Sequence, residues 1–166
     1  MDPIKVALAV ASTAASAATA VAQGRQQEAV FDYNANINER NAKVADIAAE
    51  QLYQTEQLKI QKFTKEFTAL NDATSQGFRY NGWMSDGGTP LLVALENASE
   101  ADLEIQIMDY NARVGEQELK EKGVQERLEA DLNTMYGDQA RIAGVMSAGQ
   151  SLLSGGADMY KTYKEG

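Results

Sequence analysis

Apolar residues recur at helical spacing in two long stretches of this chain, one before and one after a glycine-rich segment. The first stretch runs from Gln26 to Gln76 without a proline or a glycine, and good helix formers dominate it. Its apolar residues recur three, four or seven positions apart: Val30, Tyr33, Ile37, Val44 and Ile47, then Phe63, Phe67 and Leu70. This period predicts one long helix with an apolar face. Since a helix of that length is not stable alone, we expect it to lie against a partner.

The second stretch has the same kind of pattern. It begins at Ser99, which resembles a helix cap with Asp102 three residues on, where glutamate would be usual. Its apolar residues are Leu103, Ile107, Tyr110 and Val114, continued by Val124, Leu128, Leu132 and Met135. The pattern predicts a second helical arm.

Glycines punctuate the segment between the two stretches. They are Gly77, Gly82, Gly87 and Gly88. The pair Asp86-Gly87 is a strong turn signal. Thr89 before Pro90 indicates an N-cap with proline at the first helical position, which predicts a short helix ending near Asn97.

Together these patterns predict an all-α fold in a single domain of 166 residues. We expect a long antiparallel helical hairpin with a glycine-rich turn, a short helix after it, and small-residue helices at both ends of the chain. The expected parts are residues 1–25, 26–76, 77–98, 99–137 and 138–166.

The N-terminal part is rich in alanine and carries a stripe of small residues. Ala7, Ala11, Ala15 and Thr19 follow one another at intervals of four, which lets helices approach closely. From Ile4 to Ala22 a helix would measure roughly 28 Å, the thickness of a bilayer core, but its alanines, serines and threonines give little transfer energy. We expect contacts with other copies, or with a membrane once several copies share the cost. An inert alanine-rich helix and a secretory signal are the alternatives, and Asp2 beside Lys5 disfavours the signal.

The C-terminal part has a similar stripe. Ala140, Gly144 and Ala148 share one helical face, so they are further candidates for oligomer or membrane contacts. Such a stripe is more typical of a tight packing face than of a pore lining.

One tetrapeptide, Asp-Tyr-Asn-Ala, occurs twice, starting at Asp32 and at Asp109. Beyond the identical residues, both copies continue with an apolar residue four positions after the tyrosine and with a Glu–Lys pair at i, i+4. These pairs are Glu39–Lys43 and Glu116–Lys120. Both copies are therefore expected to form the same amphipathic helical turn, although convergence of ordinary helical sequences remains an alternative.

Composition excludes most catalytic chemistry. The chain has no cysteine and no histidine, so it lacks a thiol nucleophile, a disulfide framework and the commonest general base. We therefore expect no enzyme activity, no cofactor and no metal site. The formal charge of −9, from 24 acids and 15 bases, argues against electrostatic binding of nucleic acid.

Two clusters are candidates for partner contacts. Five acids without an intervening base, Glu96, Glu100, Asp102, Glu104 and Asp109, would suit a basic partner or Ca²⁺, but their spacing matches no EF-hand loop, and a solvated helix face is the alternative. Trp83, Phe78 and Tyr80 form an aromatic cluster in the turn, which would insert into a partner or membrane interface or cap the core of the hairpin.

The order of these features resembles the small internal virion proteins of short-tailed phages, of the internal virion protein B type. The resemblance rests on an alanine-rich start, the stretch FDYNANINERNAKVADIAAEQ, the loop within GWMSDGGTPLLVALENASEADLEIQIMDYNARV, and the tail ARIAGVMSAGQSLLSGG. Gly88, Thr89, Pro90 and Leu91 correspond to the family's shared turn. This chain differs from the family in being acidic after the loop and in lacking an arginine-rich run before it.

The resemblance implies a non-enzymatic virion protein that forms a ring or tube near the portal or tail and assists genome ejection. Proteins of that family lie inside the capsid, leave with the genome and help to build a conduit across the host envelope. Expected partners are other copies, portal, tail or core proteins, and the host membrane, with DNA passing nearby without specific binding. The alternative is a cellular helical-hairpin adaptor or scaffold that binds other proteins.

Overall fold

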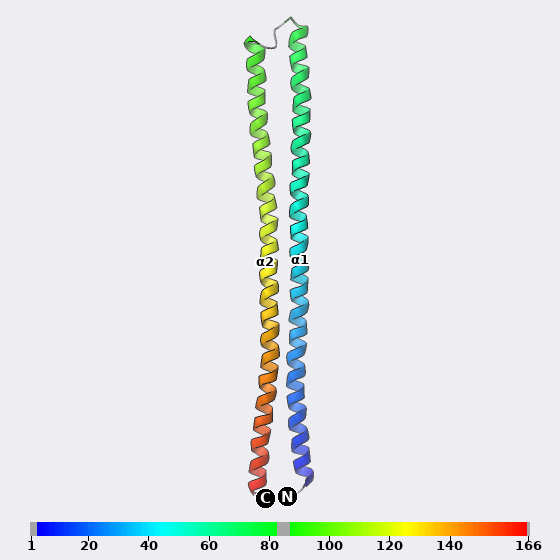
Figure 1. The fold of residues 1–166 in the computed structure, drawn as a ribbon, viewed down its shortest axis with the longest axis vertical. Helices are drawn as coiled ribbons and strands as arrows, with labels where there is room; N and C mark the ends of the chain where they lie inside the picture. Colours follow the sequence, from blue (N-terminus) through cyan, green and yellow to red (C-terminus); the bar gives the residue numbers. More distant parts are fainter. Residues whose placement is uncertain (1–2, 83–86, 166) are drawn as a thin grey trace. The chain divides into compact units, whose positions relative to one another are not determined.

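The computed structural model describes residues 3–82 and 87–165, apart from the side chains of residues 3–9, 158, 159 and 162–165. Two helices of 78 residues make up nearly all of it, α1 (Pro3–Tyr80) and α2 (Gly88–Glu165). They are joined by a short connection and form a helical hairpin (Figure 1). The predicted all-α hairpin is confirmed.

The helices are more continuous than the sequence predicted. The small-residue segments at both ends are not separate helices, because α1 and α2 each run through them without a break. The short helix predicted to end near Asn97 was also wrong: Ser99 lies inside α2 and caps nothing. Pro90 is the third residue of α2, where its missing N–H would have no partner within the helix, so it does not interrupt the helix. No proline or strong turn signal follows it that would end the helix near Ser99.

Glycine allows α1 to end sharply. The Asn81 N–H donates to the Gly77 carbonyl at 3.2 Å, and the Gly82 N–H donates to the Arg79 carbonyl at 3.1 Å. Gly82 has a φ of 81°, in the left-handed region that residues with a side chain rarely adopt. Gly88, with a φ of 63°, begins α2 in the same region. The residues expected to form the turn, Gly88, Thr89, Pro90 and Leu91, lie in the first turn of α2.

The chain divides into two compact units. Unit 1 comprises residues 1–42 and 125–166, and unit 2 comprises residues 43–124. In each unit a stretch of α1 packs against a stretch of α2.

Small residues form the contact between the helices of unit 1. The buried residues are Ala17, Gly24, Ala35 and Ala42 on α1 and Ala130, Gly137, Gly144 and Ala148 on α2. A Cβ on Gly24 would lie 2.9 Å from the Gly144 Cα, and a Cβ on Gly144 would lie 2.9 Å from the Gly24 Cα. The two backbones therefore touch at this point, which only glycine permits.

Unit 2 is built in the same way. Its buried residues are Ala45, Ala49 and Ile60 on α1 and Pro90, Ala101, Ala112 and Gly123 on α2. The Leu52 side chain lies over Gly115, where a Cβ would come within 3.0 Å of a leucine methyl carbon. Both units thus have a thin core, in which backbone approaches backbone and few large side chains are covered.

The apolar faces predicted from the sequence are largely on the outside. The following residues are exposed: Val30, Tyr33, Ile37, Val44, Ile47 and Leu70 on α1, and Leu103, Ile107, Tyr110, Val124, Leu128, Leu132 and Met135 on α2. We call these thirteen side chains the outer apolar residues. Of the predicted faces, only Phe63, Phe67 and Val114 are half-buried. The partner expected for each long helix is the other arm, but the predicted apolar faces do not form the contact, because the helices approach most closely through alanine and glycine.

Candidate interaction surface

The outer apolar residues of unit 1 lie on both helices. On α1 they include Val30, Tyr33 and Ile37, which follow one another at intervals of three and four residues and so share one helical face. On α2, Leu128, Leu132 and Met135 are spaced in the same way. Unit 1 therefore has a strip of large apolar side chains on each helix that neither helix covers.

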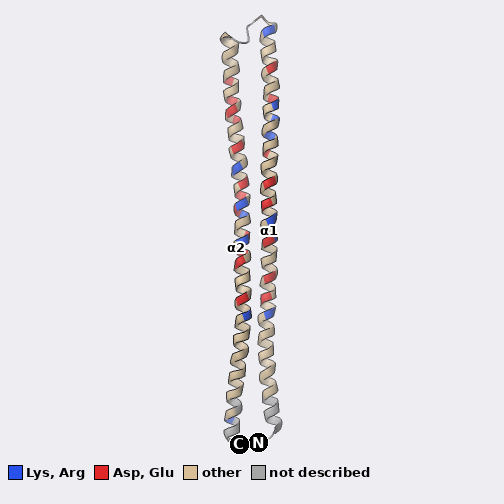
Figure 2. Cartoon of the chain, in the orientation of Figure 1, with Lys and Arg blue, Asp and Glu red and all other residues tan. Residues whose placement is uncertain are grey.

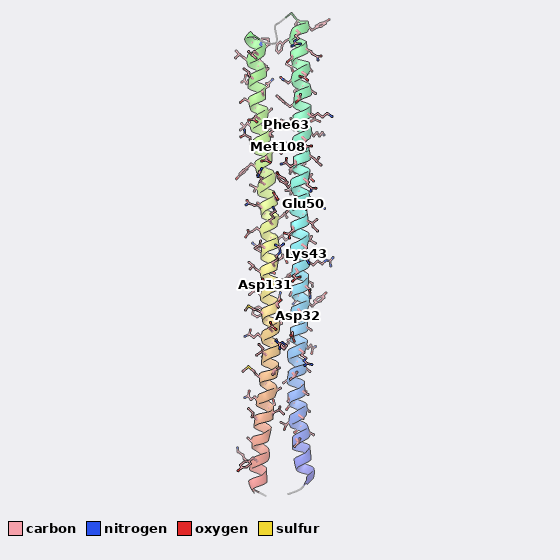
Figure 3. The ribbon with its side chains drawn as sticks, viewed as in Figure 1. Asp32, Lys43, Glu50, Phe63, Met108 and Asp131 are labelled. Atoms are coloured by element: carbon pink, nitrogen blue, oxygen red, sulfur yellow. The ribbon has the colours of Figure 1, made fainter. Side chains whose placement is uncertain are left out.

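Unit 2 has the same property. Val44 and Ile47 on α1 and Leu103, Ile107 and Tyr110 on α2 are exposed. Side chains stand out from both helices along the described part of the chain (Figure 3). Each unit therefore has outer apolar residues of its own on both helices.

The repeated tetrapeptide occupies the same environment in both helices. Ala35 and Ala112 are 7% and 1% exposed, and Tyr33 and Tyr110 are 67% and 68% exposed. In each copy the alanine therefore contacts the other helix and the tyrosine faces outward, so the two copies take the same position on their helices. Lys120 Nζ lies 2.6 Å from Glu116 Oε1, whereas no such ion pair joins Glu39 and Lys43 among the described residues.

Of the two predicted small-residue stripes, the N-terminal one is exposed and most of the C-terminal one is buried between the helices. Ala11, Ala15 and Thr19 are exposed, so this stripe faces away from α2. The side chain of Ala7 lies outside the described residues. Gly144 and Ala148 are buried against α1, and the pairing within the hairpin already covers them. Ala140 is half-buried.

A groove crosses the side of unit 2. It has a volume of about 410 Å³ and is lined by Phe63, Phe67, Leu70, Asn71 and Thr74 from α1 and by Asn97, Glu100, Ala101 and Glu104 from α2. Phe63 is labelled in Figure 3. The groove is thus lined by two aromatic rings and two carboxylates.

The two helices of unit 2 differ in charge near this groove. On α2 the residues from Glu96 to Asp109 include five acids and no base. The corresponding stretch of α1 carries Lys59, Lys62 and Lys65 together with Glu56 and Glu66, and both signs of charge are seen along α1 (Figure 2). Within the described residues, no group of three or more acids is arranged to hold a metal ion, so the Ca²⁺ alternative finds no site there.

Asp109 is the one acid of this run that is held on both sides. It accepts hydrogen bonds from Arg113 Nε and from Gln57 Nε2, both at 2.8 Å. The Arg113 bond is the main cause that lowers the pKa of Asp109, and the Gln57 bond lowers that pKa further. Since Gln57 lies on α1, this carboxylate also fixes the register of the two helices.

Polar contacts fix the register of unit 1 as well. Arg141 Nε lies 3.1 Å from Glu28 Oε1, and Asn41 Nδ2 donates to Glu126 Oε2 at 3.2 Å. The Phe31 and Tyr136 rings are 5.8 Å apart between centroids and tilted by 46°. These contacts bridge α1 and α2, but none of them forms a catalytic arrangement.

The aromatic cluster predicted in the turn is only partly described. Trp83 lies outside the described residues. Phe78 is half-buried, and Tyr80 is 94% exposed at the end of α1. In the part of the chain that the structure describes, neither helix contains a stretch apolar enough to span a bilayer. The segment from Ile4 to Ala22 begins outside that part, because side chains are described only from Val10.

No model of a known protein family matches this chain, and neither a curated protein nor a solved structure matches it.

The contact between the helices was only partly predictable from the sequence, through the stripe with Gly144 and Ala148, and the groove was not predictable. In unit 1 the contact has a signal in the sequence, because Ala130, Gly137 and Gly144 are spaced by seven residues, or two helical turns. The groove has no comparable signal, since its phenylalanines and glutamates come from distant parts of the chain.

Proposed function

We propose that this chain is a non-enzymatic structural protein that acts by assembling with copies of itself and with other proteins of a phage particle. The observation that carries the proposal is the exposure of large apolar side chains on both helices, while alanine and glycine fill the contact between them. A hairpin with this distribution has apolar surface to bury only against another molecule.

Burial of these side chains contributes a free energy of the same size as the cost of association. Burying the exposed half of one large aliphatic side chain contributes about 1 kcal/mol. About ten such side chains would therefore contribute about 10 kcal/mol, which is comparable to the association cost of about 4 to 15 kcal/mol. The outer apolar residues exceed this number if most of them take part.

The resemblance to small internal virion proteins supports the setting of the proposal. In that setting the chain resides in the capsid near the portal or tail, forms a ring or tube with its copies, contacts portal, tail or core proteins, and leaves with the genome. The formal charge of −9 suits a wall beside which DNA passes without being held.

The same setting includes the host envelope. A conduit built from several copies would expose its outer apolar residues to the membrane and keep its polar residues toward the interior. This arrangement needs no single helix that spans the bilayer alone.

Mass spectrometry of purified phage particles tests the proposal. We expect this chain in the particle at many copies, and we expect it to leave the particle when the genome is ejected. If the chain occurs only in the host cell and never in particles, the proposal is contradicted and the helical-hairpin adaptor gains support.

A further inference from the structure

The groove of unit 2 offers a specific contact for a second copy of the chain, and this inference rests on the proposed self-association. Phe63, Phe67 and Leu70 form its apolar part, and Glu100 and Glu104 lie on its α2 side. No ion pair joins Glu100 or Glu104 to a base within the described residues. The groove therefore has an apolar surface and two carboxylates that a cationic side chain could satisfy.

The charge of α2 beside the groove indicates which kind of side chain can bind there. From Tyr80 to Ala112 the chain contains no lysine or arginine. An occupant that placed acids in the groove would meet only like charges from α2, which is costly at an interface. The side chains that bind in the groove near Glu100 and Glu104 must therefore be basic.

The chain itself carries such a basic segment at the same height. The hydrogen bond between Gln57 and Asp109, at 2.8 Å, sets the two helices level at that point. Lys62 is five residues beyond Gln57 and Glu104 is five residues before Asp109, so both lie about 7.5 Å nearer the connection. Lys65 and Glu100 are likewise level to within one residue.

These lysines point away from their own α2. Ile60 is buried between the helices, and each residue turns the helix by about 100°. Lys62 therefore lies about 200° around α1 from Ile60, and Lys65 about 140°. The Lys62 side chain is 76% exposed and has only a long contact of 3.7 Å with Glu66.

We propose that Lys62 and Lys65 of one copy occupy the groove of the next copy, and that the two copies lie side by side in the same orientation. The aliphatic parts of the lysines then lie on Phe63 and Phe67 of the neighbour, and the ammonium groups reach Glu100 and Glu104. Because a neighbour in the same orientation presents its lysines at the height of these glutamates, no shift along the helices is needed. Each copy has both a groove and a lysine pair, so the contact repeats from copy to copy.

Charge reversal tests the contact. We expect Lys62→Glu with Lys65→Glu to raise the dissociation constant of self-association by about 10- to 100-fold at low salt, because four acids then meet at one groove. When the two lysine substitutions are combined with Glu100→Lys and Glu104→Lys, the dissociation constant should return to within about threefold of that of the unchanged protein. The reason is that opposite charges again meet at the groove. Sedimentation analysis measures each constant, and circular dichroism checks that every variant remains helical.

A matched variant controls for net charge. Lys43→Glu with Lys161→Glu changes the net charge by the same amount at two exposed lysines away from the groove. We expect it to weaken self-association by less than about threefold, as exposed charges away from a contact contribute little. Equal weakening by both double variants would contradict the proposal.

Introduced thiols test the orientation, because the natural chain has no cysteine. In an oxidised mixture of a tagged Lys65→Cys variant and an untagged Glu100→Cys variant, we expect a disulfide between the two proteins. Ile47→Cys and Glu118→Cys provide a second pair displaced by 18 residues on each helix, or five full turns, on the same faces. Copies in the same orientation form both mixed disulfides, whereas copies in opposite orientations form at most one of them.

The outcomes separate this inference from the proposed function. If the natural chain remains monomeric, self-association itself fails. If the natural chain assembles while the charge-reversed variant assembles equally well, or while neither thiol pair forms a mixed disulfide, the contact proposed here is wrong and self-association stands.

Discussion

At the residue scale, the approach of the two backbones at Gly24 and Gly144 decides which substitutions unit 1 tolerates at these positions. Gly24 and Gly144 face each other so closely that a Cβ on Gly144 would also lie 2.9 Å from the Ala20 carbonyl oxygen. A backbone atom cannot move aside as the end of a flexible side chain can. Gly149, five residues later on α2, has nothing within 4 Å of the place where a Cβ would be.

These two glycines should respond oppositely to alanine. In a helix, alanine is favoured over glycine by about 1 kcal/mol, so Gly149→Ala should stabilise the protein by about that amount and raise Tm by about 2 to 4 °C. Gly144→Ala should lower Tm despite the same gain, because the helices must separate and overpacking costs about 1 to 3 kcal/mol. Thermal unfolding followed by circular dichroism measures both. A rise in Tm for Gly144→Ala would show that the backbones do not touch.

The carboxylate of Asp109 should make the stability of the protein depend on pH. Its pKa is lowered mainly by the Arg113 hydrogen bond and then by the Gln57 bond. A lowered folded-state pKa contributes stability that is present above the unfolded-state pKa and is lost as the pH falls through the folded-state value. We therefore expect NMR titration to give a midpoint for Asp109 below that of an ordinary aspartate, and Arg113→Gln to raise it. An unchanged midpoint in Arg113→Gln would contradict the assignment of the cause.

At the element scale, the two helices were predictable and their contact face was not. The long stretch without proline or glycine and the spacing of residues such as Val30 and Leu128 identify helices regardless of which side is covered. A hydrophobic pattern is dominated by large side chains, so in this chain it indicates the exposed face and not the face that is covered by the other helix. The covered face depends on how closely two backbones approach, which alanine and glycine decide. The register was also beyond the sequence, since it depends on pairs such as Gln57–Asp109.

The repeated tetrapeptide tests this distinction between faces. Ala35→Leu and Ala112→Leu should each destabilise the protein by about 1 to 3 kcal/mol, because both alanines are buried between helices and leucine overpacks them. The double variant Tyr33→Ser with Tyr110→Ser should keep a free energy of unfolding by urea within about 1 kcal/mol of that of the unchanged protein. It should also weaken self-association. Ala69→Leu, at an exposed position on α1, is the control for adding a leucine. Equal destabilisation by Ala69→Leu would contradict the assignment of the buried face.

At the scale of the whole molecule, composition and exposure favour the same conclusion. The sequence lacks cysteine and histidine, which leaves little catalytic chemistry, and the structure leaves large apolar side chains uncovered in both units. A protein with a thin core and an apolar exterior gains stability by association, since the same side chains that gain nothing in the monomer are covered between copies. The virion setting comes from the resemblance alone, because neither the fold nor the charge identifies a virus.

Sedimentation velocity over a range of protein concentrations tests the central claim most directly. We predict that the full chain of 18.0 kDa sediments as a defined oligomer. A variant with Tyr33, Ile37, Leu132 and Met135 each changed to serine should remain helical and assemble more weakly than the unchanged chain, because four of the six outer apolar residues of unit 1 are removed. A folded, helical full chain that stays monomeric at the highest concentration would contradict the claim that it acts by assembly.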